Sequence, residues 1–379
     1  MNKFALTFLL FLLLPAGAPA QEQPGTAPEL AAKSWLLYDY TSNQILVSRN
    51  GDERIEPASL TKLMTAYLTF SAIRDHKFPL TQSIYPSAEA ARSHDDESRM
   101  FLDPRKAVTV DELLHGLIIL SANDAARELA DLVAGSETAF AEQMNREAQR
   151  LGMLNTHFVN ATGLPAPQHY TSAHDLALLA AAITHDFPAY MPLYGQREYQ
   201  YNGIKQFNRN RLLWNDPYVD GMKTGHTESA GFCLVASARR DNRRLISVVI
   251  GTATDSLRAS ESQRLLNYGF HDFEAVRLYQ KEQPVSTVRL WKGTENKLRV
   301  GFLNDFYLTI PTGTRAQLKA DMETQQPLTA PIVLGQKIGT LKFTLNGKPY
   351  GEYPLLALDN VSLANVFSRG LDSIRLLFQ

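Results

Sequence analysis

A serine and a lysine three residues apart, Ser59 and Lys62, have the types and spacing of a nucleophile and its base. Pro57 suits a first helical position, and an apolar stripe follows, so a helix is predicted to begin here with both side chains on one face. A lysine takes the proton of a serine hydroxyl only when its amine is neutral. Because free lysine has a pKa of about 10.4, reaction near neutral pH needs a depression of roughly 3 units. Burial and a second nearby cation both lower the pKa.

Two later motifs supply the other groups that such a site needs. The Lys-Thr-Gly sequence at 223–225 ends a strand-like segment: Lys223 is the candidate second cation, and the Thr224 hydroxyl can bind a substrate carboxylate. Gly225 is expected to let the strand approach a substrate closely. The Ser-Ala-Asn sequence at 121–123 lies at a predicted junction of two helices. There Ser121 can relay a proton to a leaving amine, and the Asn123 amide can hold a peptide carbonyl.

The backbone N–H groups of Ser59 and His226 are the expected oxyanion hole, in which losing one donor typically costs about 3–4 kcal/mol. These groups together describe acyl transfer through a serine, without a cofactor. No metal site is predicted, because the histidines have no HExxH or similar spacing. The single cysteine, Cys233, excludes an intramolecular disulfide and a cysteine-based zinc site.

The order of strand-like and helical segments predicts an α+β catalytic domain over residues 27–273. A hairpin comes first, a run of helices follows, and extended segments come last, which predicts an antiparallel sheet flanked by helices with N- and C-terminal strands adjacent. The predicted strands cover 34–40, 44–48, 198–201, 218–223, 231–239 and 245–251. After the helix at Pro57, helices are predicted at the capping box Thr109–Glu112, at 124–133 before Gly135, and at 140–151, 174–184 and 260–273. The polar stretch 81–107 is predicted as a solvated loop that can border a cleft.

The last hundred residues have a different sequence pattern from the preceding part of the chain. Apolar and polar residues alternate over 286–291, 297–310, 316–322 and 338–345, which predicts a small all-β sandwich over residues 276–358. Residues 360–379 have the pattern of an amphipathic helix, with apolar side chains on one face. Such a helix can lie in a membrane interface or dock on its own β domain.

The first twenty residues predict a secretory signal peptide. Lys3 is followed by an apolar run over 4–14 and a small-residue cleavage site at 18–20, and the run is too short for a comfortable transmembrane helix. An uncleaved anchor is the alternative. With 44% hydrophobic and 20% charged residues and a formal net charge of −1, the chain has the composition of a globular protein and lacks the basic excess of a nucleic-acid-binding protein.

The three motifs in this order are the marks of penicillin-binding proteins and class A β-lactamases. The chain resembles the low-molecular-mass penicillin-binding proteins that act as D-alanyl-D-alanine carboxypeptidases. The resemblance covers nearly the whole chain, including 100–102, 220–227 and the β domain with its tail. It implies a serine β-lactamase/DD-peptidase-like fold, an acyl-enzyme on Ser59, release of the terminal D-alanine from peptidoglycan stem pentapeptides, and then hydrolysis. It also implies covalent inhibition by β-lactams through the same serine.

The resemblance adds two arginines and a location. Arg209 in the sequence 208–210 and Arg258 in the sequence 257–262 resemble family positions near the substrate carboxylate. With the export signal, the tail implies a periplasmic protein that is peripheral on the inner membrane through its C-terminal helix.

Three alternatives remain open to different degrees. A class A β-lactamase needs a Glu-x-x-Leu-Asn carboxylate, but Leu151 stands where that glutamate should precede Leu154-Asn155, so efficient β-lactam turnover is not expected. A non-catalytic wall-binding scaffold has no use for Ser59 and Lys62. A DD-endopeptidase acting on crosslinked peptidoglycan would use the same residues, so the sequence does not separate it from a carboxypeptidase.

Overall fold

The computed structural model describes residues 27–92 and 97–376, so the predicted signal peptide lies outside the described residues. An antiparallel five-stranded sheet in the order β2-β1-β9-β8-β7 forms the centre of the N-terminal domain. Its strands are β1 (Ser34–Asp39), β2 (Gln44–Arg49), β7 (Val219–Thr227), β8 (Gly231–Arg240) and β9 (Arg243–Thr252). Because β1 pairs with β9, the predicted adjacency of N- and C-terminal strands is confirmed.

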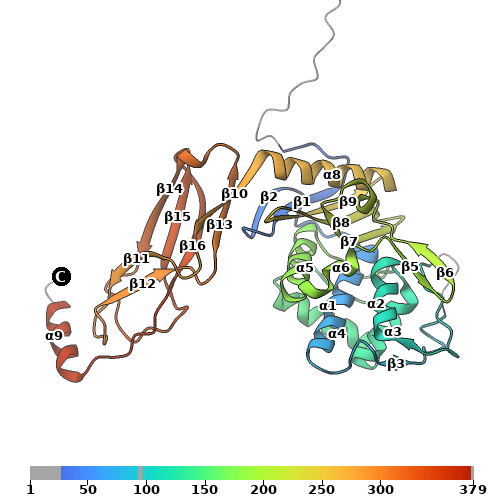
Figure 1. Cartoon of the computed structure of the whole chain (residues 1–379), viewed down its shortest axis with the longest axis horizontal. Coiled ribbons are helices and arrows are strands. Elements are labelled where there is room, and N and C mark those ends of the chain that lie inside the picture. The colour runs from blue at the N-terminus through green and yellow to red at the C-terminus, as the bar shows by residue number, and fades with distance from the viewer. Residues whose placement is uncertain (1–26, 93–96, 377–379) are drawn as a thin grey trace, which may run out of the picture.

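Helices cover both faces of this sheet (Figure 1). Side chains alternate across it: Leu36 packs into the larger core, whereas Leu37 packs into the core beneath α8. The long helix α8 (Asp255–Asp272) lies on the second face in Figure 1, where Leu212 and Leu213 of a short helix also join its core, and the other helices of the domain lie on the first. They are α1 (Lys62–Arg74), α2 (Val110–Ile119), α3 (Asn123–Ala134), α4 (Glu137–Arg150), α5 (Ala173–Asp186) and α6 (Met191–Tyr194).

Capping residues explain where several helices begin or end. The predicted capping box at Thr109 and Glu112 opens α2, and Gly135, with φ 82°, ends α3. The prediction for α8 was five residues too late, because the Thr254 hydroxyl accepts the N–H of Leu257 and caps an earlier start. Between these helices lie two small hairpins, β3 (Ser83–Ile84) with β4 (Val108–Thr109) and β5 (Glu198–Tyr201) with β6 (Ile204–Phe207), and the short helix α7 (Leu212–Asn215).

The C-terminal domain is all-β, as predicted. A two-stranded sheet, β10 (Phe273–Tyr279) with β13 (Phe306–Pro311), accompanies a five-stranded sheet in the order β11-β12-β16-β15-β14, and Leu308, Phe343 and Leu355 share the core between them. The five strands are β11 (Pro284–Arg289), β12 (Lys297–Gly301), β14 (Leu318–Thr324), β15 (Lys337–Leu345) and β16 (Lys348–Ala357), with a 3-10 turn at Arg315–Gln317. The single predicted segment 297–310 was wrong: the chain bends before β13, where the Asp305 carboxylate accepts the N–H of Lys281.

A buried polar cluster joins the two domains. The fully buried Asp39 at the end of β1 accepts hydrogen bonds from Arg243 Nε at 2.8 Å and from Thr309 Oγ1 at 2.7 Å. The Gln44 side chain bonds both the N–H and the C=O of Thr309. Since a buried charge is tolerated only when paired and hydrogen-bonded, these contacts hold β13 in register against the β1–β2 hairpin.

The tail helix α9 (Val366–Leu376) begins six residues later than the predicted start at 360. It lies at the far end of the β domain from the catalytic helices (Figure 1). Its apolar side chains do not dock on that domain: Phe367 is 87% exposed and Leu371 58% exposed, while the contact with the domain is polar, from the Lys292 N–H to the Asp372 carboxylate. Leu377 and Phe378, assigned to the same face, lie outside the described residues. Among the described helices, none is long and apolar enough to span a bilayer.

Candidate active site

A cavity of about 740 Å³ opens along the end of β7. The predicted site residues that line it are Ser59, Ser121, Asn123, Arg209, Thr224, Gly225, His226 and Arg258. The remaining two, Lys62 and Lys223, are buried and reach the cavity through Ser59 and Ser121. The structure therefore brings together every residue that the motifs singled out, from segments up to two hundred residues apart.

The amine of Lys62 lies within hydrogen-bond distance of three oxygens. Its Nζ is 3.1 Å from Oγ of Ser59, 2.7 Å from Oδ1 of Asn123 and 2.6 Å from the carbonyl oxygen of Thr162. The amide and carbonyl oxygens are acceptors only, whereas the serine hydroxyl also donates. A neutral amine has two hydrogens and one lone pair, so it satisfies all three contacts when the hydroxyl donates to it.

Burial favours this neutral form. Lys62 is 1% exposed, and the pKa of its amine is lowered to about 7, chiefly by desolvation. The cations of Arg209 and Arg127 act in the same direction, and the carboxylates of Glu97 and Asp124 act against them. Burial acts as expected, but the expected second cation was wrong: the positive charges that lower the pKa of Lys62 are those of Arg209 and Arg127 rather than that of Lys223.

Lys223 occupies the opposite wall. Its Nζ donates to Oγ of Ser121 at 2.8 Å and to the carbonyl oxygen of Thr224 at 2.8 Å. Burial lowers the pKa of Lys223 well below its ordinary value, and the charge of Lys62 and two arginines adds to the effect. Two buried amines facing one cleft thus each disfavour a proton on the other.

The turn that carries Ser59 is not the plain helix start that Pro57 predicted. Ala58–Thr61 forms a 3-10 turn (η1) ahead of α1, and Ala58 has φ 47°. Ser121 has φ 62°, so each reactive hydroxyl lies at or beside a residue in the left-handed region. Such conformations cost about 1–3 kcal/mol each for non-glycine residues and persist only where the surroundings impose them.

Two glycines let neighbouring segments hold that turn. A Cβ at Gly163, which has φ +85°, would lie 1.8 Å from the carbonyl oxygen of Ala58. A Cβ at Gly225 would lie 3.2 Å from Ala58 Cβ, Leu60 Cγ and the Pro57 carbonyl oxygen. Gly225 therefore allows a close approach between β7 and η1, and because it also lines the cavity, its predicted role in the approach to a substrate stays a prediction.

A neutral histidine, His169, forms a hydrogen bond with the same turn. The N–H of Val159 donates to Nδ1 of His169, which leaves the ring proton on Nε2, 2.9 Å from Oγ1 of Thr61. Burial lowers the pKa of His169 to about 4, so the ring stays neutral in the range where Lys62 titrates.

The two arginines carried over from the family differ in their surroundings. Arg209 is exposed at the cavity wall. Arg258 is 5% exposed, forms an ion pair with Asp255, and donates to the carbonyl oxygen of Gly225 at 3.1 Å. Arg258 therefore holds the backbone of β7 from behind, and Arg209 is the more accessible guanidinium.

Sequence reasoning missed three contributors to this site. Glu97 lies in the stretch assigned to a solvated loop, yet its side chain is 5% exposed and accepts from Asn123 Nδ2 and from Arg127, both at 2.8 Å. Arg127 follows Asn123 by one helical turn, a spacing that would have placed both on one face of α3. The Thr162 carbonyl carried no signal, because any residue provides that group.

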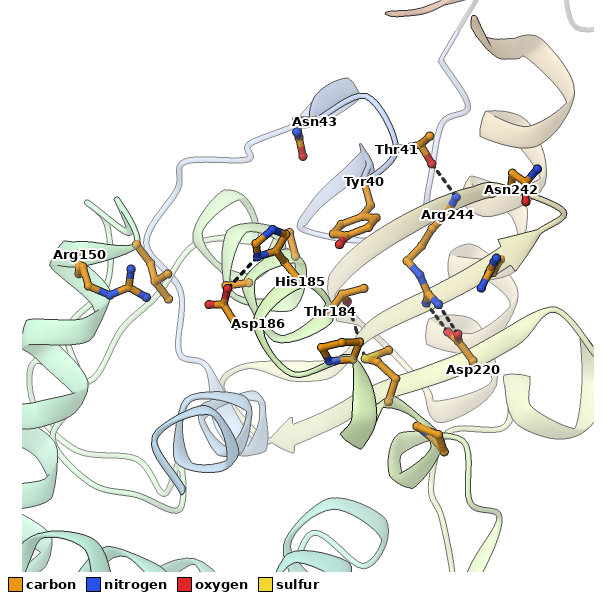
Figure 2. Close-up of a pocket in the computed structure, with 17 residues that line it drawn as sticks. Tyr40, Thr41, Asn43, Arg150, Thr184, His185, Asp186, Asp220, Asn242 and Arg244 are labelled. Atoms are coloured by element: carbon orange, nitrogen blue, oxygen red, sulfur yellow. Dashed lines mark hydrogen bonds and ion pairs between the residues drawn. The ribbon is translucent and has the colours of Figure 1, made fainter. Parts of the chain in front are cut away.

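A larger cavity of about 940 Å³ lies at the other end of β7, away from these groups (Figure 2). Among the residues that line it, Arg244 forms an ion pair with Asp220, and Nδ1 of His185 lies 2.8 Å from Oδ1 of Asp186. Leu151, which stands where a class A β-lactamase would carry its glutamate, lines this second cavity. That position therefore faces away from the serine cleft.

Fold and site together define a two-domain protein in which a helix-covered antiparallel sheet presents a Ser-Lys-Ser-Lys cleft. Residues 20–254 match the sequence profile of the peptidase S11 family, described as D-alanyl-D-alanine carboxypeptidase, and residues 273–362 match the C-terminal domain of penicillin-binding protein 5. The chain is 42% identical over 375 residues to the D-alanyl-D-alanine carboxypeptidase DacC of Escherichia coli, covering 97% of this chain and 94% of that protein.

Solved structures agree with these matches. Penicillin-binding protein 5 from Haemophilus influenzae superposes with a TM-score of 0.85 at 40% identity, covering 89% of this chain and 99% of that one. Penicillin-binding protein D2 from Listeria monocytogenes, in a cefotaxime-bound form, gives 0.60 at 28% identity over 65% of this chain and 99% of that one. The chain belongs to the D-alanyl-D-alanine carboxypeptidase family of serine peptidases, and the predicted α+β fold with a C-terminal all-β domain is confirmed.

Packing of Gly163 against η1 generates a testable prediction. Gly163→Ala is expected to lower the free energy of unfolding by at least about 3 kcal/mol, because a left-handed φ and a backbone clash act together. Gly152→Ala is the matched control, since Gly152 has φ +78° but nothing within 4 Å of its added Cβ, and should cost only about 1–2 kcal/mol. Urea denaturation measures both. Equal losses would contradict the close packing of Gly163 on Ala58.

Proposed function

We propose that this protein is a serine-type D-Ala-D-Ala carboxypeptidase that removes the terminal D-alanine from peptidoglycan stem pentapeptides through an acyl-enzyme on Ser59. The observation that carries the proposal is the 3.1 Å contact between Oγ of Ser59 and the buried amine of Lys62, whose other two partners are acceptors. That arrangement activates a hydroxyl near neutral pH without any further group.

Acylation follows from these contacts. With both hydrogens of Lys62 held by Asn123 and Thr162, the lone pair faces the Ser59 hydroxyl and takes its proton as the oxygen attacks the carbonyl of the penultimate D-alanine. The N–H groups of Ser59 and His226 receive the negative charge that develops on that oxygen. The C–N bond then breaks as Ser121 relays the proton that Lys62 took from Ser59 to the amine of the departing D-alanine, which leaves Lys62 neutral again. Water later cleaves the ester, and Lys62 serves as base again.

Recognition of the substrate rests on the hydroxyl and guanidinium groups along the wall of the cavity that β7 and Arg209 form. A free terminal carboxylate would meet the Thr224 hydroxyl and the exposed guanidinium of Arg209, with Lys223 behind them. Arg258 contributes by holding the carbonyl of Gly225 and thereby the edge of β7. A crosslinked peptide offers the same scissile bond, which is why a DD-endopeptidase remains the alternative reaction.

The same serine is the proposed target of β-lactams. A β-lactam amide opened by Ser59 would leave an ester in the cavity, where no leaving group departs to make room for water. The relative from Listeria monocytogenes is described in ampicillin- and cefotaxime-bound forms, which supports this part of the proposal.

We expect Ser59→Ala to abolish both covalent labelling by a fluorescent penicillin and release of D-alanine from a muramyl pentapeptide, because among the described residues the hydroxyl that the Lys62 amine contacts is that of Ser59. Mass spectrometry of the products from pentapeptide and from a crosslinked dimer separates the two reactions. Release of one D-alanine by the wild type supports the carboxypeptidase, and cleavage of the dimer alone supports the endopeptidase. Labelling of the variant at the wild-type level would mean that Ser59 is not the nucleophile.

We further propose the following division of the chain: an export signal at 1–20, the catalytic domain at 27–273, the β domain at 276–358 and an amphipathic tail at 360–379. The protein would then work in the periplasm, peripheral on the inner membrane. The support is the exposed apolar face of α9, formed by Val366, Phe367, Leu371 and Ile374. An apolar helix face left exposed at the end of a domain suits an interfacial helix.

Deleting residues 361–379 is expected to move the protein from the membrane fraction to the soluble fraction, with unchanged activity on soluble pentapeptide. A finer comparison uses Phe367→Asp, which should weaken vesicle binding, against Val333→Asp, which places the same charge on an exposed apolar residue of the β domain. Sedimentation with anionic lipid vesicles measures both. Continued membrane attachment of the truncated protein would contradict the role of the tail.

A further inference from the structure

The buried carboxylate of Glu97 is connected to the proposed base, Lys62, through one intervening side chain, that of Asn123. The Glu97 side chain, from the segment that borders the cleft, is 5% exposed and lines the cavity. Its Oε2 accepts from Nδ2 of Asn123 at 2.8 Å and from a guanidinium nitrogen of Arg127 at 2.8 Å. Asn123 in turn accepts from Lys62 through Oδ1 at 2.7 Å. A continuous chain of hydrogen bonds therefore runs from Arg127 through Glu97 and Asn123 to the amine.

We propose that Glu97 is a positioning residue, which with Arg127 orients the Asn123 amide and thereby sets the readiness of Lys62 to accept the Ser59 proton. The inference rests on the proposed roles of Ser59 and Lys62. It concerns residues that neither the family motifs nor the chemistry of acyl transfer requires.

The first argument is geometric. A side-chain amide has a donor end and an acceptor end, and a carboxylate accepts only. Contact with Glu97 therefore commits the NH₂ group of Asn123 to one side and turns Oδ1 toward Lys62. In the flipped orientation the NH₂ group would face the amine, compete for its lone pair and leave one lysine hydrogen without its acceptor. Glu97 thus selects the orientation in which the lone pair remains available for Ser59.

The second argument is electrostatic. The charged groups around Lys62 come from four elements: Glu97 from the cleft segment, Asp124 and Arg127 from α3, Arg209 after β6, and Lys223 from β7. Glu97 raises the pKa of Lys62, and Arg127 lowers it. Because Glu97 and Arg127 form a salt bridge, their opposite effects on the pKa of Lys62 largely cancel. The Asn123 amide is therefore held by a strong charge-assisted hydrogen bond, with little net change in the proton affinity of Lys62.

This pairing also explains why a carboxylate is tolerated there. A lone buried anion beside Lys62 would favour the ammonium form and disable the base. Arg127 lies one turn along α3 from Asn123 and binds the same oxygen of Glu97 that the amide binds. The arginine therefore neutralises the carboxylate at the point where it approaches the lysine.

The test is the pH dependence of penicillin acylation in Glu97→Gln, Arg127→Gln and the double variant. Acylation requires neutral Lys62, so its rate rises with pH through the pKa of that amine. Removing the Glu97 charge should move this rise to lower pH, and removing the Arg127 charge should move it to higher pH, each by about half a unit. The double variant should return close to the wild-type midpoint, with a plateau rate reduced by about tenfold because the amide loses its charge-assisted anchor.

Glu147→Gln is the matched control, since it breaks the Glu147–Arg150 ion pair on α4, away from the cleft, and should leave the profile unchanged. Shifts in one direction for both single variants, or no shift in either, would overturn the proposal. So would a Glu97→Gln protein that acylates normally but fails only to deacylate, because Glu97 would then activate water directly. Failure of the proposed function would be recognised separately, because the wild type itself would then form no Ser59 adduct.

Discussion

Burial of two lysine amines on opposite walls of one cleft is the constraint on which this structure depends. An isolated ammonium is expensive to bury, so each amine must either lose its proton or find acceptors. Lys62 has the acceptors that suit a neutral amine, and Lys223 has Ser121 and a backbone carbonyl. Burial thus yields a base at Lys62 that works near neutral pH, and the accessible guanidinium of Arg209 supplies the positive charge that suits an anionic substrate end.

The fold serves this constraint by bringing two segments against one strand. The strand β7 carries Lys223, the turn η1 carries Ser59, and the junction of α2 and α3 carries Ser121. Gly163 allows a backbone contact with η1 that any side chain would prevent, Gly225 packs tightly on the same turn, and Ala58 and Ser121 are in left-handed conformations. The sheet, whose central strands are buried on both faces, provides the rigid surroundings that impose these unfavourable backbone conformations.

The motifs predicted the members of the cleft because each depends on a side chain of particular chemistry at a particular spacing. The sheet and its helix layers were predictable as well, since alternation and caps such as Thr109 and Gly135 are local signals. The predictions failed where tertiary contacts overrode local pattern: Pro57 precedes a 3-10 turn, and 297–310 divides between two sheets. Glu97 was missed for a related reason, because a polar loop gives no indication that one carboxylate folds inward against Arg127.

The protonation state of Lys62 tests the central claim most directly. A protein labelled with ¹³C at lysine Cε, with the Lys62 signal assigned from a Lys62→Met variant, reports the titration of that amine by NMR. The account predicts a midpoint near the pKa of about 7 that burial and the neighbouring arginines impose. A midpoint near the value of about 10.4 for free lysine would contradict it, because the amine beside Ser59 would then carry its proton throughout the neutral range.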